Sequence, residues 1–111
     1  MDVDASVFED LAAEIGRDAA QQTFVIFIAE TEIRLRRLRQ LSCHDERAAI
    51  RQEAHALKGA AGNFGLPRVA DLAKTLEQEA TAITPHDYAV VIDGLEARYD
   101  AARQRLAELV A

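Results

Sequence analysis

The sequence contains no tryptophan and only one cysteine, Cys43. A single cysteine excludes a disulfide within the chain, and it leaves no pair of cysteines at the spacing of a zinc site. Aromatic residues make up only 5% of the chain, whereas alanine, leucine, glutamate and arginine are abundant. This composition is typical of a helical protein and gives little support to a β-sheet fold.

Positive charge is also in short supply, because 13 lysines and arginines face 19 aspartates and glutamates, for a formal net charge of −6. Proteins that bind nucleic acid are expected to present a basic stripe, so we expect no nucleic-acid partner. No run reaches the roughly 20 apolar residues that a membrane span needs. The first four residues, 1–4, lack the basic and apolar regions of a secretory signal. These absences predict a cytoplasmic protein with no membrane partner.

Apolar residues recur every three or four positions in five segments, which predicts five helices. The 111 residues are expected to form a single domain, 1–111, with one core. Short connections favour antiparallel neighbours. We therefore predict an all-α fold, an antiparallel up-down-up-down four-helix bundle with an additional short N-terminal helix across one end. The first helix is expected to start after Asp4, its N-cap, and to end at Ile15, and the second to run from Ala19 to Leu41 with Asp18 as N-cap. The remaining helices are expected from Asp45 as N-cap to Asn63, from Pro67 to Ala80, and from Pro85, capped by Thr84, to the C-terminus.

The third predicted helix has an unusual polar face. Its apolar residues form one narrow stripe, and His55, Gly59 and Gly62 point the opposite way, with Arg51 and Lys58 on the flank. Each glycine inside a helix costs about 0.5–1 kcal/mol relative to alanine. Two of them beside one histidine need a reason, and the simplest is close approach by another macromolecule.

The run from His55 to Gly65, His-Ala-Leu-Lys-Gly-Ala-Ala-Gly-Asn-Phe-Gly, resembles the signature of histidine-containing phosphotransfer (HPt) domains. That signature reads His-x-hydrophobic-Lys-Gly, followed by small residues and a closing glycine. The expected helix order extends the resemblance over nearly the whole chain. It implies a phosphoryl carrier in a phosphorelay, which accepts a phosphoryl group on His55 from the aspartates of response-regulator receiver domains and donates it to them. A sensor (hybrid) histidine kinase is a further implied partner.

The resemblance also implies roles for individual residues. Nε2 of His55 would attack the phosphoaspartate, and the Lys58 ammonium would lie near the phosphoryl oxygens. Glu77, or Gln78 if the turn differs by one residue, would accept a hydrogen bond from Nδ1 of His55. An exposed Glu77 paired with Lys74 three residues earlier is the competing interpretation.

No acidic pair beside a lysine and no glycine-rich phosphate cradle is evident in the sequence. We therefore expect the protein to have no cofactor of its own and no turnover of ATP. It is expected to be a phosphoryl carrier without a kinase domain and not an enzyme. The magnesium ion and the catalytic aspartate are expected to come from the receiver partner.

Arg51, Gly59 and Gly62 are predicted to contact that partner. The second helix has more apolar residues than one stripe can use, because Val25, Ile26 and Ile33 fall outside it. We expect the first helix to cover some of them. Val25 and Ile28 are the candidates for an apolar docking patch at the level of the histidine.

Three competing functions differ in chemistry. A histidine-kinase dimerisation domain usually has an acidic residue after its histidine, where this chain has Ala56, and a nearby proline, which is absent before Pro67. A metal-carboxylate bundle needs Glu-x-x-His pairs, and here Gln52 takes the place of the glutamate. A helical adaptor that binds receivers without phosphotransfer stays open. Five helices in one chain favour a monomer.

The arginines of the second helix, Arg34, Arg36, Arg37 and Arg39, alternate with core leucines. We interpret them first as a solvated face near the helix C-terminus, and second as a surface that steers an acidic partner. His44 and His86 lie at predicted turns and are assigned no role.

Overall fold

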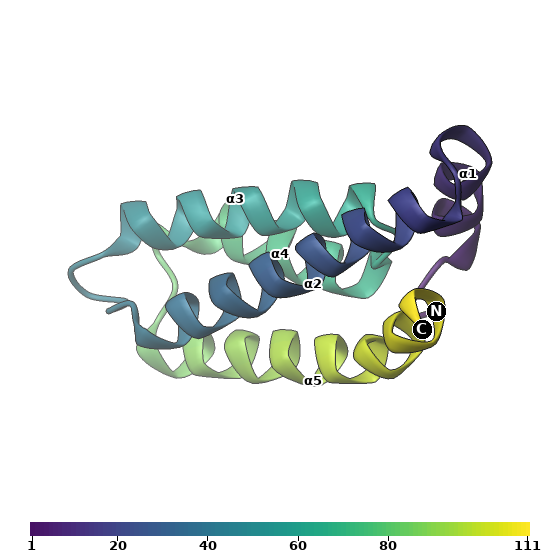
Figure 1. Cartoon of the computed structure of the whole chain (residues 1–111). Coiled ribbons are helices and arrows are strands. Elements are labelled where there is room, and N and C mark those ends of the chain that lie inside the picture. The colour runs from purple at the N-terminus through teal and green to yellow at the C-terminus, as the bar shows by residue number, and fades with distance from the viewer.

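The computed structural model describes residues 1–111 and contains five helices and no strand. Four helices run antiparallel along a body measuring 45 × 21 × 19 Å, and the short first helix crosses one end (Figure 1). The predicted fold class is therefore confirmed. The helices are α1 (Ala5–Ile15), α2 (Arg17–Gln40), α3 (Arg47–Asn63), α4 (Pro67–Glu79) and α5 (Pro85–Val110).

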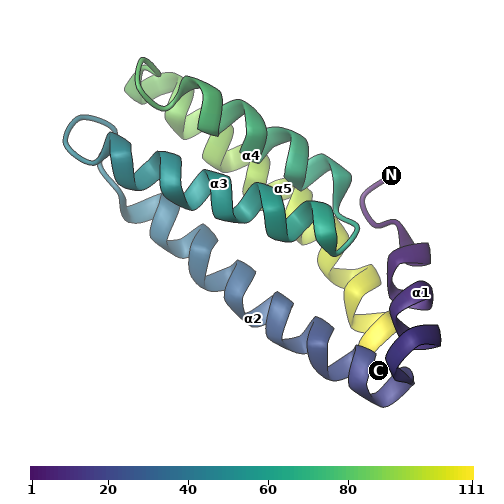
Figure 2. The same ribbon diagram turned by 90° about the horizontal axis from the view of Figure 1, so that it is seen from above.

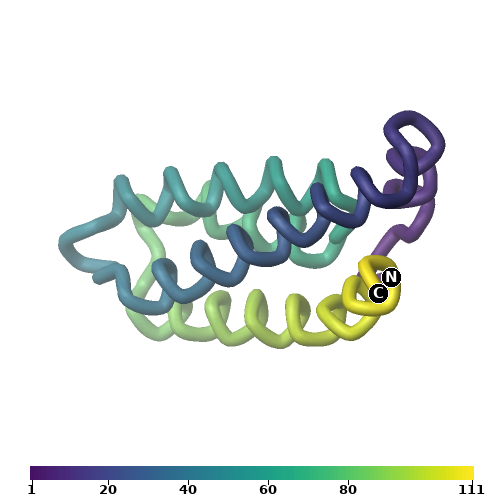
Figure 3. The backbone as a smooth tube through the Cα atoms, in the orientation of Figure 1, coloured from purple at the N-terminus to yellow at the C-terminus, as the bar shows by residue number.

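Each long helix of the bundle packs against two neighbours. The adjacent pairs are α2 with α3, α3 with α4, α4 with α5 and α5 with α2. The edge formed by α3 and α4 is therefore opposite the edge formed by α2 and α5, as the view from above shows (Figure 2). Both chain termini lie at the end that α1 crosses (Figure 3).

Several predicted helix ends are confirmed. The Asp4 carboxylate accepts a hydrogen bond from the Ser6 amide at 3.1 Å, and the Thr84 hydroxyl accepts one from the Asp87 amide at 3.1 Å. These bonds satisfy amides that have no partner within the first turn of a helix. Pro67 and Pro85 are each the first residue of a helix, where the absent amide hydrogen costs nothing.

Two predicted N-caps are wrong. α2 begins at Arg17, directly after Gly16, so Asp18 lies within the first turn instead of capping it. α3 begins after Glu46 and not after Asp45. The turn before α3 has its own hydrogen bonds, because the Glu46 carboxylate accepts from the Ser42 amide at 2.9 Å and the Ser42 hydroxyl accepts from the Asp45 amide at 3.3 Å. Because these hydrogen bonds hold residues 42–46 in a turn, α3 begins one residue later than predicted.

The predicted core stripe of α2 is buried from Ala20 to Leu38, and Leu41 is half-buried. Ile28 joins this core with an exposed fraction of only 6%. It lies on the side of α2 that faces α5, where the Tyr99 hydroxyl reaches its carbonyl oxygen at 3.5 Å. The prediction that Ile28 is part of a docking patch is therefore wrong.

α1 does not cover the surplus apolar residues of α2, since Val25, Ile26 and Ile33 are 51%, 58% and 56% exposed. It buries Phe8 instead, whose ring meets that of Phe24 edge to face with centroids 5.1 Å apart. The expectation that α1 shields the apolar surplus is wrong because α1 crosses the end of the bundle and does not lie along its side (Figure 2).

Gly65 joins α1 to the turn between α3 and α4. Its φ of +80° lies in the left-handed region that favours glycine. The Leu66 amide donates to the Ala61 carbonyl at 2.8 Å and closes α3, as expected for this type of helix end. The Asp4 amide donates to the Gly65 carbonyl at 2.7 Å. A Cβ at residue 65 would lie 2.7 Å from the Asp4 carbonyl oxygen.

The arginines of α2 connect neighbouring helices. Arg34 and Arg37 reach Glu53 of α3 at 3.0 and 3.4 Å. Arg39 reaches two carboxylates of α5, those of Asp93 and Glu96, at 2.6 and 2.5 Å. The interpretation as a solvated face holds for Arg36, Arg37 and Arg39, which are exposed, whereas Arg34 is half-buried. What the sequence did not show is that Arg34, Arg37 and Arg39 pair with carboxylates of other helices. Only Arg36 of the four makes no ion pair.

We expect Gly65→Ala to destabilise the fold by about 2–3 kcal/mol. Alanine is strained at the positive φ of this residue, and its Cβ would also clash with the Asp4 carbonyl oxygen. Gly62→Ala in the preceding helix should act in the opposite direction, because a Cβ there meets no atom within 4 Å. Chemical denaturation of both variants measures the difference, and equal stability of the two would contradict this account of Gly65.

Candidate functional site

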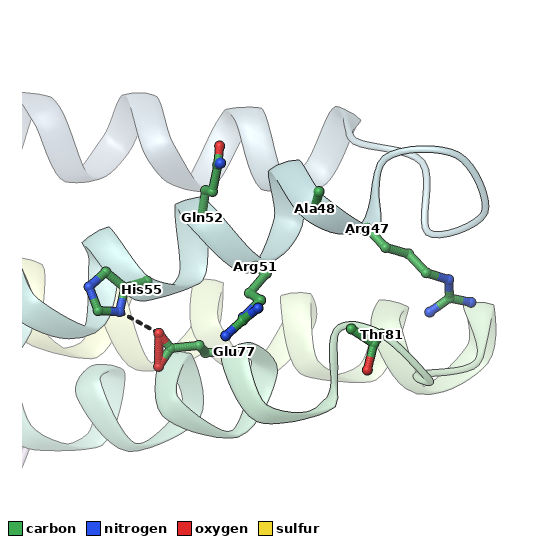
Figure 4. A pocket seen from close by; sticks show the side chains of 7 residues that line it. All are labelled: Arg47, Ala48, Arg51, Gln52, His55, Glu77 and Thr81. Atoms are coloured by element: carbon green, nitrogen blue, oxygen red, sulfur yellow. Dashed lines mark hydrogen bonds and ion pairs between the residues drawn. The ribbon is translucent and has the colours of Figure 1, made fainter.

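His55 lies in the middle of α3 on the side of that helix away from the core. The buried residues of α3 occupy the face that packs into the bundle, and they are Ile50, Ala54, Leu57 and Ala61. The spacing of a helix then turns His55 outward, and its side chain is 71% exposed. The imidazole leans toward α4 across the edge of the bundle (Figure 4).

Glu77 of α4 holds this imidazole. Its Oε2 makes a hydrogen bond with Nδ1 of His55, while its own side chain is only 16% exposed. An ionised carboxylate accepts hydrogen bonds and donates none, so Nδ1 bears the proton and Nε2 of the neutral ring has a free lone pair. Gln78 is exposed and lines a separate hollow with Ala82 and Asp87, away from the histidine. The structure thus brings Glu77, and not Gln78, to the histidine.

Lys58 shares the same carboxylate. Its Nζ donates to Oε1 of Glu77 at 2.6 Å, so the two oxygens of Glu77 are divided between an ammonium and an imidazole. The competing interpretation, an exposed Glu77 paired with Lys74, is not seen. Lys74 is exposed and makes no ion pair.

The two partners keep Glu77 ionised. The hydrogen bond from Lys58, and to a lesser degree the one from His55, lowers the pKa of the Glu77 carboxyl below its ordinary value of 4.5. A carboxylate that is charged at neutral pH is the acceptor that fixes the ring of His55 in one tautomer. The arrangement therefore leaves one ring nitrogen exposed and nucleophilic.

A hollow of about 480 Å³ adjoins the histidine on the side of the start of α3. Arg51 contributes to it from one turn before His55, and Thr81 from the turn that follows α4 (Figure 4). Sequence reasoning missed Arg47, which also lines the hollow. Its Nη1 donates to the carbonyl oxygens of Ala80 and Ile83, both at 2.9 Å. Backbone acceptors leave no sequence pattern, so nothing could have pointed to this residue.

Gly59 and Gly62 lie on the other side of His55 and are exposed. A Cβ at either position would meet no atom within 4 Å, so packing inside the bundle does not require glycine there. Their lack of side chains leaves the surface beside the imidazole flat and open.

Val25 lies away from the histidine. It is exposed but lines a hollow with Ile26 and with Val110 of α5. This hollow is at the edge between α2 and α5, opposite the edge that holds His55 (Figure 2). Val25 is exposed, as predicted, but no residue of α3 or α4 lines its hollow, so the structure does not bring it together with His55.

No three side chains of the metal-binding types, His, Cys, Asp and Glu, cluster at a possible metal site. None of the five helices combines the length and apolarity that crossing a membrane requires.

The family model of the Hpt domain matches residues 22–108 of this chain. The chain belongs to the Hpt domain family. The matched segment includes His55, Lys58 and Glu77, and it leaves α1 outside.

One relative and one solved structure resemble this Hpt domain. Phosphorelay protein LuxU of Vibrio harveyi is 31% identical over 74 residues, which are 67% of this chain and 65% of LuxU. The match thus spans slightly less than two thirds of that relative. The crystal structure of histidine-containing phosphotransfer protein B (HptB) from Pseudomonas aeruginosa PAO1 superposes with a TM-score of 0.87 at 24% identity. That superposition covers 96% of this chain and 92% of HptB, so the two share a fold.

We expect Glu77→Gln to lower the melting temperature of this Hpt domain at pH 7. Because the pKa of Glu77 is lowered in the folded state, its contribution to stability is complete above pH 4.5 and is lost as pH falls through the folded-state pKa. The difference between wild type and Glu77→Gln should therefore shrink on acidification. Melting curves across this range test it.

Glu79→Gln on the same helix is the matched control, because Glu79 is exposed and makes no ion pair. A Glu77→Gln difference that persisted unchanged to pH 2 would rule out a role for the ionised carboxylate.

Proposed function

We propose that this Hpt domain carries a phosphoryl group on Nε2 of His55 and exchanges it with the aspartates of response-regulator receiver domains. The observation that supports this most directly is the exposed imidazole whose Nδ1 is held by Glu77. Membership of the Hpt family and the likeness to the phosphorelay protein LuxU point to the same activity.

The chemistry follows from the orientation of the ring. The Nε2 lone pair attacks the phosphorus atom of a phosphoaspartate, the bond from phosphorus to the aspartate oxygen breaks, and the carboxylate leaves with that electron pair. The proton stays on Nδ1, where the Glu77 carboxylate stabilises the positive charge that the ring gains as the new bond forms. Phosphoryl transfer of this kind depends mainly on position and charge. The reverse sequence of steps returns the group to a receiver.

Lys58 supplies positive charge for the same step. It lies one turn after His55, and its ammonium already sits on the carboxylate that holds the ring. Once a phosphoryl group is bound to His55, the Lys58 ammonium would contact the phosphoryl oxygens. In the free protein, Glu77 keeps the lysine beside the ring.

The remaining components belong to the partners. A receiver domain supplies the catalytic aspartate and the magnesium ion, and a sensor (hybrid) histidine kinase is the first source of phosphate. The domain itself acts as a monomeric cytoplasmic carrier with no cofactor of its own and no activity on ATP.

The central test is incubation of wild type and His55→Gln with a phosphorylated receiver domain. Wild type should acquire acid-labile phosphate and His55→Gln none, a loss of at least about a hundredfold. His44→Gln and His86→Gln are matched controls, because both histidines are exposed and lie outside the site.

Uptake of phosphate by His55→Gln would refute the proposal. Binding of the receiver without phosphate uptake, in wild type as well, would instead identify the adaptor that the sequence left open.

The two open glycines give a second test with opposite signs for stability and function. Gly59→Ala and Gly62→Ala should each stabilise the fold by about 0.5–1 kcal/mol. Both should slow transfer from a receiver, and leucine at either position should slow it further, because the added side chain separates His55 from the phosphoaspartate.

Gly94→Ala provides the control. It makes the same change inside α5, where a Cβ would meet the Leu72 side chain at an ordinary 3.5 Å. It should leave transfer unchanged. Unchanged transfer in all four variants at residues 59 and 62 would show that partners do not approach over this surface.

A further inference from the structure

The surface of α3 is asymmetric about His55. On one side lies the flat surface of Gly59 and Gly62, and on the other the hollow lined by Arg51. No acidic side chain is exposed on α3, although the chain has 19 acidic residues. The one acid of this helix, Glu53, is turned toward α2, where it pairs with two arginines.

Arg51 is the one cation of α3 without a partner. Arg47 is occupied by two backbone carbonyls, and Lys58 is occupied by Glu77. Arg51 is exposed and makes neither an ion pair nor a hydrogen bond. Glu77 is the only acid that lines the hollow, and Lys58 already offsets its charge. A second carboxylate placed in this hollow would meet an unpaired guanidinium.

The free ring nitrogen of His55 does not point toward Arg51. Figure 4 shows the nitrogen of His55 that is free of Glu77 turned away from Arg51. A phosphoryl group on that nitrogen would therefore point away from Arg51, which leaves the charge of Arg51 for another acceptor.

We propose that Arg51 and the hollow beside it receive a carboxylate side chain of the receiver domain and so determine which receivers dock and in which orientation. This inference rests on the proposed function. The guanidinium favours a carboxylate because its fork of donors matches the two oxygens. The glycine surface on the far side of His55 is left for the part of the receiver that bears the phosphoaspartate.

The effect of Arg51 falls on encounter and partner choice. Exposed ion pairs contribute little to affinity, whereas charges at the rim of an interface alter the association rate and its dependence on salt. A receiver that lacks the carboxylate would be slower to dock, and one with a lysine in its place would be repelled.

The experiment measures kcat/KM for transfer from a phosphorylated receiver domain that serves wild type. Arg51→Glu should lower this value about fivefold or more at low ionic strength. The loss should shrink to less than about twofold in 1 M salt, where the screening length falls to about 3 Å. The kcat/KM of Arg51→Lys at low ionic strength should lie between those of wild type and Arg51→Glu, because lysine keeps the charge but lacks the two-pronged donor group of arginine.

Arg98→Glu is the matched control. Arg98 is exposed, makes no ion pair and lies on α5, which is diagonal to α3, so the same change in net charge occurs far from the site. It should leave kcat/KM unchanged. An equal loss in Arg98→Glu, or a loss in Arg51→Glu that salt does not reduce, would overturn the proposal. His55→Gln, assayed in parallel, separates this outcome from failure of the proposed function, because it tests transfer itself.

Discussion

The site depends first on the orientation of α3, which is set by burial of one apolar face. The small residues Ala54 and Ala61 alternate with Ile50 and Leu57 on that face, and all four are fully buried. Rotation of the helix by even one position would expose large apolar side chains and draw His55 toward the core. Burial of this apolar face is therefore enough to turn the histidine outward.

The second constraint is a single carboxylate with two partners. Glu77 reaches across from α4 to hold the ring of His55, and Lys58 limits the negative charge that the ring experiences. Neither helix could form this arrangement alone. The packing of α3 on α4 therefore determines chemistry as well as stability, because it sets the distance over which the carboxylate must reach.

Much of this could be predicted from the sequence, because the relevant information is local. Helical spacing placed His55 on the outer face, and the motif around it indicated Lys58 and the two open glycines. The position of Glu77 required a count across a turn whose length is fixed by Gly65 and Pro67, and that count was correct.

The errors concern long-range packing. Ile28 was assigned to the surface, although α5 covers it, and Val25 was placed near the histidine without knowledge of which side of α2 faces α3. The pairing of Arg34 with Glu53 was equally invisible, because the two residues lie on different helices. Spacing within one helix gives the faces of that helix, but it does not say which neighbour each face meets.

The hydrogen bond between residues 4 and 65 gives the closing glycine of the motif a mechanical role. It joins two backbone groups, so it does not depend on the side chain at residue 4, whereas a side chain at residue 65 would press against the Asp4 carbonyl oxygen. The last glycine of the motif takes no part in reactivity, yet it fastens the crossing helix to the hairpin that presents the histidine. One short run of sequence therefore contains both the reactive histidine and the glycine that joins its hairpin to α1.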